Sequence, residues 1–142
     1  MKDLVKLYAN AKLVEDFRID VDDGRSHAIC LDLPREDDGT NMGPSALELC
    51  VMSHVGCYAA IFVLTAKKMR FLLKDLEIKV EAVKSEEAGT VTEEKFEIIV
   101  KINAPEDRIQ RIHKLTLQNC PVGKIFENAG IKISYALRAE KE

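Results

Sequence analysis

The sequence predicts an α+β protein in which alternating segments accompany one long apolar helix. Residues 75–84 and 93–103 alternate apolar and polar side chains, as half-buried strands do. Between residues 45 and 69 the apolar residues instead lie nearly all round a helix, which is typical of a buried helix. Taken along the whole chain, the expected order of elements is βββαββααβ, and this order favours an α+β class.

The N-terminal part of the chain predicts strands and then a loop. Residues 3–9 and 11–21 alternate loosely and indicate two strands, and Asp22-Asp23-Gly24 is a turn signal. A third strand is expected over residues 26–33. Residues 34–44 contain two prolines, two glycines and a charged run, so they predict a loop.

The central helix is expected from about Ser45 to Met69. Ser45 and Glu48 have the spacing of a capping box, in which the hydroxyl and the carboxylate bind amides of the first turn. Lys67 and Lys68 suit the negative end of the helix dipole. These signals mark both ends of the helix.

The C-terminal half predicts a hairpin, two helices and a final strand. The alternating segments 75–84 and 93–103 are joined by a short polar linker, which indicates an antiparallel hairpin. Helices are expected over residues 105–119 and 121–129, each with a proline near its start. Residues 131–137 alternate again and predict the last strand.

Composition limits the partners that we expect. A chain of 142 residues predicts a single domain over residues 1–142. Its 21 basic and 24 acidic residues give a net charge of -3 with no basic tract, so nucleic acid is not an expected partner. The N-terminus has no apolar signal region, which predicts a cytoplasmic protein. The longest apolar run, Val55 to Ala66, is too short to span a bilayer, so no membrane partner is expected.

The four cysteines point to chemistry or core filling rather than to structural disulfides, because the cytoplasm is reducing. Cys57 lies in the apolar helix, where a thiol tends to stay protonated. Cys120 precedes Pro121 and would cap the next helix, where the dipole lowers a thiol pKa. Cys30 and Cys50 are expected to pack. We find no Cys-x-x-Cys spacing and no nucleotide, flavin or metal motif, so no cofactor is expected.

Two motifs resemble the OsmC/Ohr family of thiol-dependent hydroperoxide reductases. The first is Pro-x-x-x-Glu-Leu from Pro44, followed by Gly-Cys at residues 56–57, and the second is Cys-Pro-Val from Cys120. The element order also fits, so the resemblance covers most of the chain, and the motif spacing is similar to a less characterised OsmC-like branch. It implies the OsmC-like fold and an intertwined homodimer, and a partner chain would also help to bury the apolar helix.

The resemblance further implies roles for the cysteines. In the family, the cysteine matching Cys57 attacks the peroxide and becomes a sulfenic acid. Cys120 would then form a disulfide with it, and a dithiol reductant of unknown identity would restore both thiols. This mechanism requires the two sulfurs to lie within disulfide reach.

The resemblance also implies an arginine that activates the attacking cysteine and a carboxylate that orients the arginine. Arg18 is the candidate arginine, with Arg25 and Arg35 as alternatives. Glu48 is the candidate carboxylate, but the family places it one residue earlier, at the position of Leu47. Glu48 can therefore be catalytic or only a helix cap.

His54 precedes Cys57 by one helical turn and shares its face. It could accept the thiol proton, or it could be a histidine that is hydrogen-bonded in the core. Together with His113 and Cys120 these residues have the types of a zinc site. The helix break between His113 and Cys120 argues against it, and we expect no metal.

We therefore expect a cysteine-based peroxidase that reduces small hydroperoxides, organic ones rather than hydrogen peroxide. The alternative is a non-catalytic OsmC-like protein, either a small-molecule binder or a redox sensor, that keeps the cysteines without the full arginine–carboxylate set. A pure interaction module would show neither loss of thiols nor binding of ligand.

Overall fold

The structure of the chain is a computed structural model that describes residues 4–140. Its element order, three strands, a long helix, two strands, two helices and a strand, confirms the predicted βββαββααβ pattern. The chain forms two compact units, Met1–Cys50 and Val51–Glu142, which we call the N-terminal and C-terminal units. Helix α1 (Ala46–Lys68) begins in the first and continues in the second. The expectation of a single domain stays a prediction.

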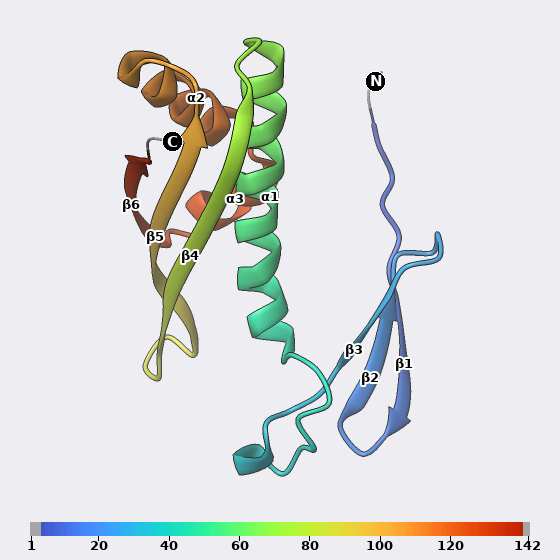
Figure 1. The fold of residues 1–142 in the computed structure, drawn as a ribbon. Coiled ribbons are helices and arrows are strands. Elements are labelled where there is room, and N and C mark those ends of the chain that lie inside the picture. Colours follow the sequence, from blue (N-terminus) through green and yellow to red (C-terminus); the bar gives the residue numbers. More distant parts are fainter. Residues whose placement is uncertain (1–3, 141–142) are drawn as a thin grey trace. The chain divides into compact units, whose positions relative to one another are not determined.

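The N-terminal unit contains an antiparallel sheet of β1 (Asn10–Glu15), β2 (Arg18–Asp22) and β3 (Ala28–Leu31), in that order (Figure 1). A short 3-10 helix, η1 (Arg35–Asp37), lies in the loop that follows. Strand register places one set of apolar residues on the same face of this sheet, because cross-strand partners point to the same side. That apolar face comprises Ala11, Leu13, Ile19, Val21, Ile29 and Leu31.

Two of the predicted strands are wrong. Residues 4–9 form no strand, and residue 3 lies outside the described residues. Residues 11–21 form most of two strands around a turn at Asp16 and Phe17, rather than one. Asp16 has a φ of 51°. Aspartate tolerates this left-handed conformation, so the chain turns here without the glycine or proline that marks most turns.

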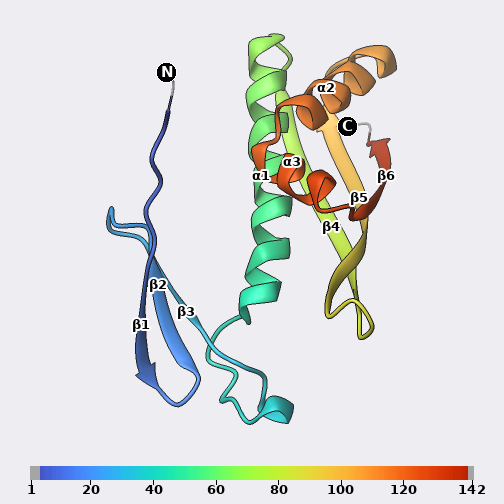
Figure 2. The same ribbon diagram turned by 180° about the vertical axis from the view of Figure 1, so that it is seen from behind.

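The C-terminal unit contains a second sheet, with strand order β4-β5-β6. Strands β4 (Leu73–Ser85) and β5 (Thr90–Ile102) form the predicted antiparallel hairpin. Strand β6 (Lys132–Ala139) pairs with β5 in parallel. A parallel pair needs a crossover connection, and helices α2 (Glu106–Asn119) and α3 (Pro121–Asn128) supply it. The helices of this unit cover one face of the sheet (Figure 2).

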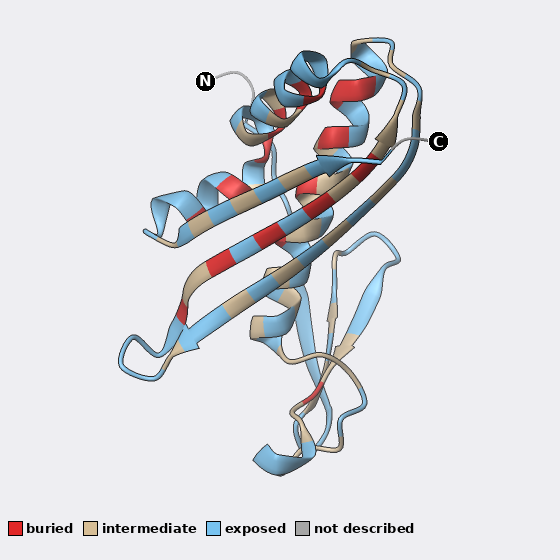
Figure 3. Ribbon diagram, turned by 60° about the vertical axis from the view of Figure 1, so that its left-hand side comes forward, coloured by how far each residue is buried: buried red, intermediate tan, exposed pale blue. Residues whose placement is uncertain are grey.

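The core of the C-terminal unit lies between the sheet and the helices. Strand β5 alternates buried and exposed residues, so one of its faces is sealed and the other is open (Figure 3). Helix α1 buries one stripe through this unit, because His54, Tyr58 and Phe62 recur one turn apart. The buried apolar cluster comprises Tyr58, Phe62, Ala66, Phe96, Ile98, Val100, Ile109 and Ile112.

The composition of helix α1 predicts burial on all faces, and this prediction is wrong. Met52, Val63 and Leu64 are 53%, 45% and 45% exposed. By length and composition alone the helix is apolar enough to cross a membrane. Core helices of soluble proteins share these properties. The short run Val55–Ala66 therefore does not exclude a membrane span by itself, and the absence of a membrane partner stays a prediction.

Ile112 tests the core. Its side chain is 0% exposed, so Ile112→Ala should lower the free energy of unfolding by about 2–5 kcal/mol, from lost burial and the cavity left behind. Ile125→Ala on α3 is the matched control, because Ile125 is 66% exposed and should cost well under about 1 kcal/mol. Urea unfolding at one fixed protein concentration measures both. Equal losses would contradict the assigned core.

Candidate functional site

The two cysteines singled out by the sequence lie on different elements of the C-terminal unit. Cys57 lies midway along α1, and Cys120 lies between α2 and α3. The extended backbone of Cys120 (φ −81°, ψ 105°) ends one helix and caps the next, with Pro121 at the first turn. Its sulfur accepts a hydrogen bond from the Gly123 N–H at 3.3 Å. The predicted N-cap is therefore confirmed.

The two sulfurs are in contact. Cys120 Sγ donates a hydrogen bond to Cys57 Sγ across 3.2 Å, and both residues are free thiols. The expected proximity of these two cysteines is therefore confirmed. A disulfide requires the two sulfurs to close from 3.2 Å to about 2 Å.

The expected lowering of the Cys120 pKa is wrong. Burial raises the pKa of this thiol to about 11, and the hydrogen bond to Cys57 raises it further, against a lowering by the Gly123 amide. Cys120 is only 2% exposed. Desolvation disfavours the charged form of a thiol, and here it outweighs the dipole of an eight-residue helix. Cys120 therefore keeps its proton and directs it at Cys57.

His54 forms a buried pair with Glu94 next to these cysteines. His54 Nδ1 lies 2.7 Å from Glu94 Oε1, and the two side chains are 1% and 0% exposed. The structure thus confirms one of the two interpretations of His54, that of a histidine hydrogen-bonded in the core. Sequence reasoning missed Glu94. The signal was available, because Glu94 is in phase with the apolar residues Phe96 and Ile98 on the buried face of β5.

Aromatic side chains enclose the site. The Tyr58 hydroxyl lies 2.6 Å from His113 Nδ1, and the Tyr58 ring stacks on Tyr135 at 6.1 Å. Burial raises the pKa of Tyr58, with Tyr135 and Cys120 adding to the effect. Burial likewise raises the pKa of Tyr135 to about 12 and lowers the pKa of His113. These groups are therefore neutral at physiological pH.

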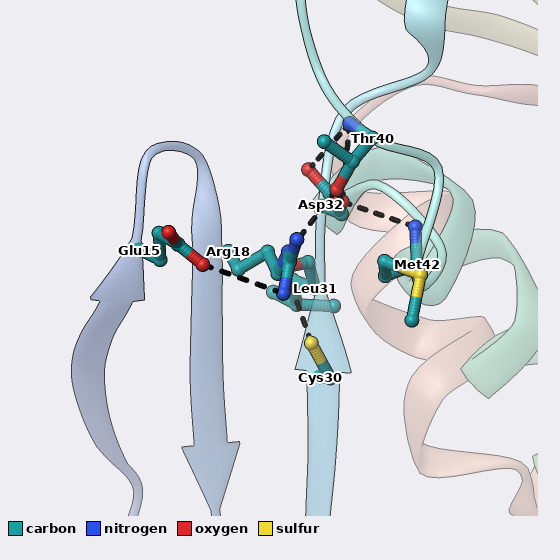
Figure 4. A network of polar contacts seen from close by, with 7 residues as sticks. All are labelled: Glu15, Arg18, Cys30, Leu31, Asp32, Thr40 and Met42. Carbon is teal, nitrogen blue, oxygen red and sulfur yellow. Dashed lines mark hydrogen bonds and ion pairs between the residues drawn. The ribbon is translucent and has the colours of Figure 1, made fainter.

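Arg18 belongs to a polar network of the N-terminal unit (Figure 4). Its Nε donates to Thr40 Oγ1 at 3.1 Å, and a terminal nitrogen lies 3.7 Å from Glu15. The Thr40 hydroxyl in turn donates to Asp32 Oδ2 at 2.6 Å. This network fixes the guanidinium against the loop after β3. Cys57 lies in the other unit, so activation of Cys57 by Arg18 stays a prediction.

Asp32 anchors that network. Its carboxylate also accepts the Leu33 amide at 2.7 Å and the Met42 amide at 3.0 Å. The Thr40 hydroxyl first, and then the Met42 amide, lower the pKa of Asp32 to about 2. Hydrogen bonds to the charged form explain the direction. The Asp32 carboxylate therefore holds together the loop after β3, and Arg18 donates to Thr40 of that loop.

The remaining candidates have local partners. Glu48 Oε1 accepts the Ser45 amide at 2.9 Å, and Ser45 Oγ accepts the Glu48 amide at 3.2 Å, so the capping box is confirmed. These bonds lower the pKa of Glu48. The described partners of Arg18 do not include Glu48, whose catalytic role stays a prediction. Arg25 is 76% exposed and pairs with Asp23. Arg35 is exposed on η1.

The other two cysteines differ from each other. The Cys30 thiol is half-buried and lies 3.8 Å from the Leu31 carbonyl oxygen, in keeping with a packing role. Cys50 is exposed, so the expectation that it fills the core is wrong. Within residues 4–140, no group of three or more histidine, cysteine or acidic side chains is arranged to hold a metal ion.

Comparison with known proteins gives a family and a fold. The family model described as OsmC-like protein matches residues 38–136. No protein with curated annotation gives a significant match. Among solved structures, an OsmC-like protein from Mycoplasma pneumoniae superposes with a TM-score of 0.84 at 18% identity, over 95% of this chain and 97% of that one.

Two further solved structures extend the comparison. An OsmC-like protein of unknown function from Vibrio cholerae gives a TM-score of 0.80 at 12% identity, covering 95% of this chain and 100% of that one. An organic hydroperoxide resistance protein from Elizabethkingia anophelis superposes with a TM-score of 0.69 at 17% identity, over 100% of this chain and 100% of that one. At these identities the similarity shows the fold alone.

Asp32 gives a prediction with a defined pH dependence. Its pKa is lower in the folded chain than the ordinary 3.8, so its contribution to stability is complete above about pH 4 and is lost as the pH falls towards 2. Asp32→Asn should therefore be less stable than the parent at pH 7, and the gap should narrow between pH 4 and 2. Urea titrations across this range measure it. Asp20→Asn, at an exposed position of β2, is the control, and an equal gap for both variants would refute the assignment.

Proposed function

The chain belongs to the OsmC-like family, and on that premise we propose that it reduces hydroperoxides, organic ones in preference to hydrogen peroxide, through Cys57 and Cys120. The family includes thiol peroxidases, and solved structures of this fold include organic hydroperoxide resistance proteins. The observation that carries the proposal is the 3.2 Å contact between the two sulfurs, with the Cys120 proton directed at Cys57.

The first step forms a sulfenic acid. The Cys57 thiolate attacks one oxygen of the peroxide bond and supplies two electrons, so an S–O bond forms and the O–O bond breaks. The other oxygen leaves with the organic group, takes up a proton and departs as an alcohol. The Cys120 thiol donates a hydrogen bond to the Cys57 sulfur, which holds the two sulfurs together at the point of attack.

The second step forms a disulfide. The Cys120 sulfur attacks the Cys57 sulfur, the S–O bond breaks, and the oxygen leaves as water. A dithiol reductant, whose identity the chain does not reveal, then restores both thiols by exchange. The difference in burial supports this order of roles. Cys57 is partly exposed and Cys120 is buried, so Cys57 is the sulfur that a substrate can reach. Arg18 and Glu48 stay candidates for activating it.

We also propose that the protein is a homodimer. Within the described part of the N-terminal unit, Asp32 is the one buried residue, so the apolar face of its sheet is not sealed. Apolar surface that is left in water forgoes the stabilisation that its burial would supply. Helix α1 of the C-terminal unit likewise exposes Met52, Val63 and Leu64. A second copy of the chain would cover apolar surface on both units at once.

The division of labour between the cysteines is testable. Cys57→Ser should abolish consumption of cumene hydroperoxide, because the attacking sulfur is lost. Cys120→Ser should still be oxidised once, because a sulfenic acid forms without a resolving thiol, and should then stall or over-oxidise. Mass spectrometry with a sulfenic-acid trap, after one equivalent of peroxide, measures both. Cys30→Ser is the matched control and should turn over like the parent.

Two outcomes would change this proposal. Sulfenic acid on Cys120 in the Cys57→Ser variant, with none on Cys57 in the Cys120→Ser variant, would reverse the roles. Oxidation of the parent to the disulfide without turnover in the presence of dithiols would favour the redox sensor. Protein whose thiols survive peroxide unchanged would contradict both.

The dimer is testable by sedimentation at low micromolar concentration. The parent should sediment at twice the chain mass of 16.0 kDa. Leu13→Gln should weaken association, because Leu13 lies on the apolar face of the N-terminal sheet and is 65% exposed in one chain. Lys12→Gln, the neighbouring residue on the opposite face, should not. A compact, stable monomer of the parent would contradict the proposal.

A further inference from the structure

The buried pair of His54 and Glu94 is not used by the steps above. The surroundings of Gly123 show that His54 lies close to Cys120. A Cβ built on Gly123 would meet Cys120 Sγ at 3.3 Å and His54 Nε2 at 3.4 Å. These two atoms therefore both lie in van der Waals range of one point, and their separation is at most the sum of the two distances.

The pair matters because Cys120 must lose its proton before it can attack. Burial raises the pKa of Cys120, so little of this thiol is ionised at neutral pH. The same protection that keeps Cys120 a donor to Cys57 would make disulfide formation slow. A base within reach of Cys120 removes this conflict.

We propose that His54 is this base: it accepts the Cys120 proton as the disulfide forms, and Glu94 is the positioning residue that orients it. The inference rests on the proposed redox role of the two cysteines. His54 Nδ1 lies 2.7 Å from Glu94 Oε1, and the other ring nitrogen, Nε2, lies on the side of Gly123 and Cys120. In the tautomer with its proton on Nδ1, His54 donates to Glu94 and the lone pair of Nε2 can accept a proton. The Phe96 and Phe126 rings lie 4.9 and 4.4 Å from the imidazole and hold it in place.

The proton and electron balance is complete within the site. The Cys120 proton moves to His54 Nε2 as its sulfur forms the S–S bond with Cys57. The hydroxide that leaves the Cys57 sulfenic acid takes that proton and departs as water. The Cys120 sulfur is oxidised, the sulfenic sulfur is reduced, and His54 returns to its starting state. During the step the imidazolium faces the Glu94 carboxylate, which stabilises it.

The burial of Glu94 supports a role beyond packing. Among the buried side-chain nitrogens and oxygens of residues 4–140, Glu94 Oε2 is the one without a hydrogen-bond partner. A buried carboxylate with an unsatisfied oxygen is costly, and apolar replacements of such pairs are often more stable. The pair therefore contributes little to the stability of the fold. Its presence is better explained by a role in the chemistry of the cysteines beside it.

The test measures resolution without any peroxide. In a Cys30→Ser, Cys50→Ser background, one equivalent of the aromatic disulfide DTNB reacts with Cys57 and releases a first thionitrobenzoate. Attack by Cys120 on the mixed disulfide then releases a second. Stopped-flow absorbance separates the two releases, so disulfide formation is observed even if the protein consumes no hydroperoxide. A failure of the proposed peroxidase activity is thereby distinguished from a failure of this inference.

Two variants and one control complete the design. His54→Gln should slow the second release by about a hundredfold near neutral pH, as the loss of a general base does. Glu94→Gln should slow it less, and Glu97→Gln, an exposed position of β5, should leave it unchanged. The first release should stay within about threefold in all of them, because it does not need the base. Equal slowing of both releases would show a merely structural role and overturn the inference.

The pH profile of the protein with His54 and Glu94 intact supplies a readout that does not depend on how the variants fold. The titratable groups placed against His54 are Glu94 on β5 and Cys120 before α3. Cys57 on α1 contacts Cys120, and Tyr135 on β6 interacts with Cys120 and Glu94. The rate of the second release should reach a plateau well below the raised pKa of Cys120. A rate that rises tenfold with each pH unit and shows no plateau would mean that hydroxide is the base, and the inference would fall.

Discussion

The hydrogen bond from the Cys120 thiol to the Cys57 sulfur is the contact on which the site depends. The extended backbone of Cys120 ends α2 and caps α3, and this position directs the side chain inward. Helix α1 packs beside it and places the sulfur of Cys57 within 3.2 Å. Burial then decides the chemistry. Because Cys120 is desolvated, it holds its proton and acts as a donor. In the proposed reaction the partly exposed Cys57 is the sulfur that meets the peroxide.

The same desolvation creates a second requirement. A thiol protected well enough to serve as a donor is a poor nucleophile in the next step, since the thiolate is the form that attacks. The crossover from β5 through α2 and α3 to β6 packs the start of α3 against His54, whose imidazole is fixed by Glu94 from β5. In the proposed proton transfer, strand β5 contributes Glu94, helix α1 contributes His54, and the cap of α3 contributes Cys120. Gly123 carries no side chain that would crowd His54 and Cys120.

Sequence patterns correctly predicted the elements whose positions depend on local signals. Alternation located the β4–β5 hairpin, Ser45 and Glu48 marked the start of α1, and Pro121 placed the helix after Cys120. They failed where nonlocal packing or a less common turn decides. The turn at Asp16 carries no glycine, and the Cys120 pKa is set by burial that only the folded chain reveals. The pairing of two distant cysteines came from the family resemblance. The partner of His54 lies forty positions away on another element, so only the fold could identify it.

Peptide mapping of the mildly oxidised protein tests the central claim most directly. Reduced protein is exposed to one equivalent of cumene hydroperoxide, the remaining thiols are alkylated, and the fragments are identified by mass spectrometry. The contact at 3.2 Å predicts a single disulfide that joins Cys57 to Cys120, with Cys30 and Cys50 alkylated. A disulfide through Cys50, or four alkylated cysteines after the peroxide has been consumed, would contradict the account.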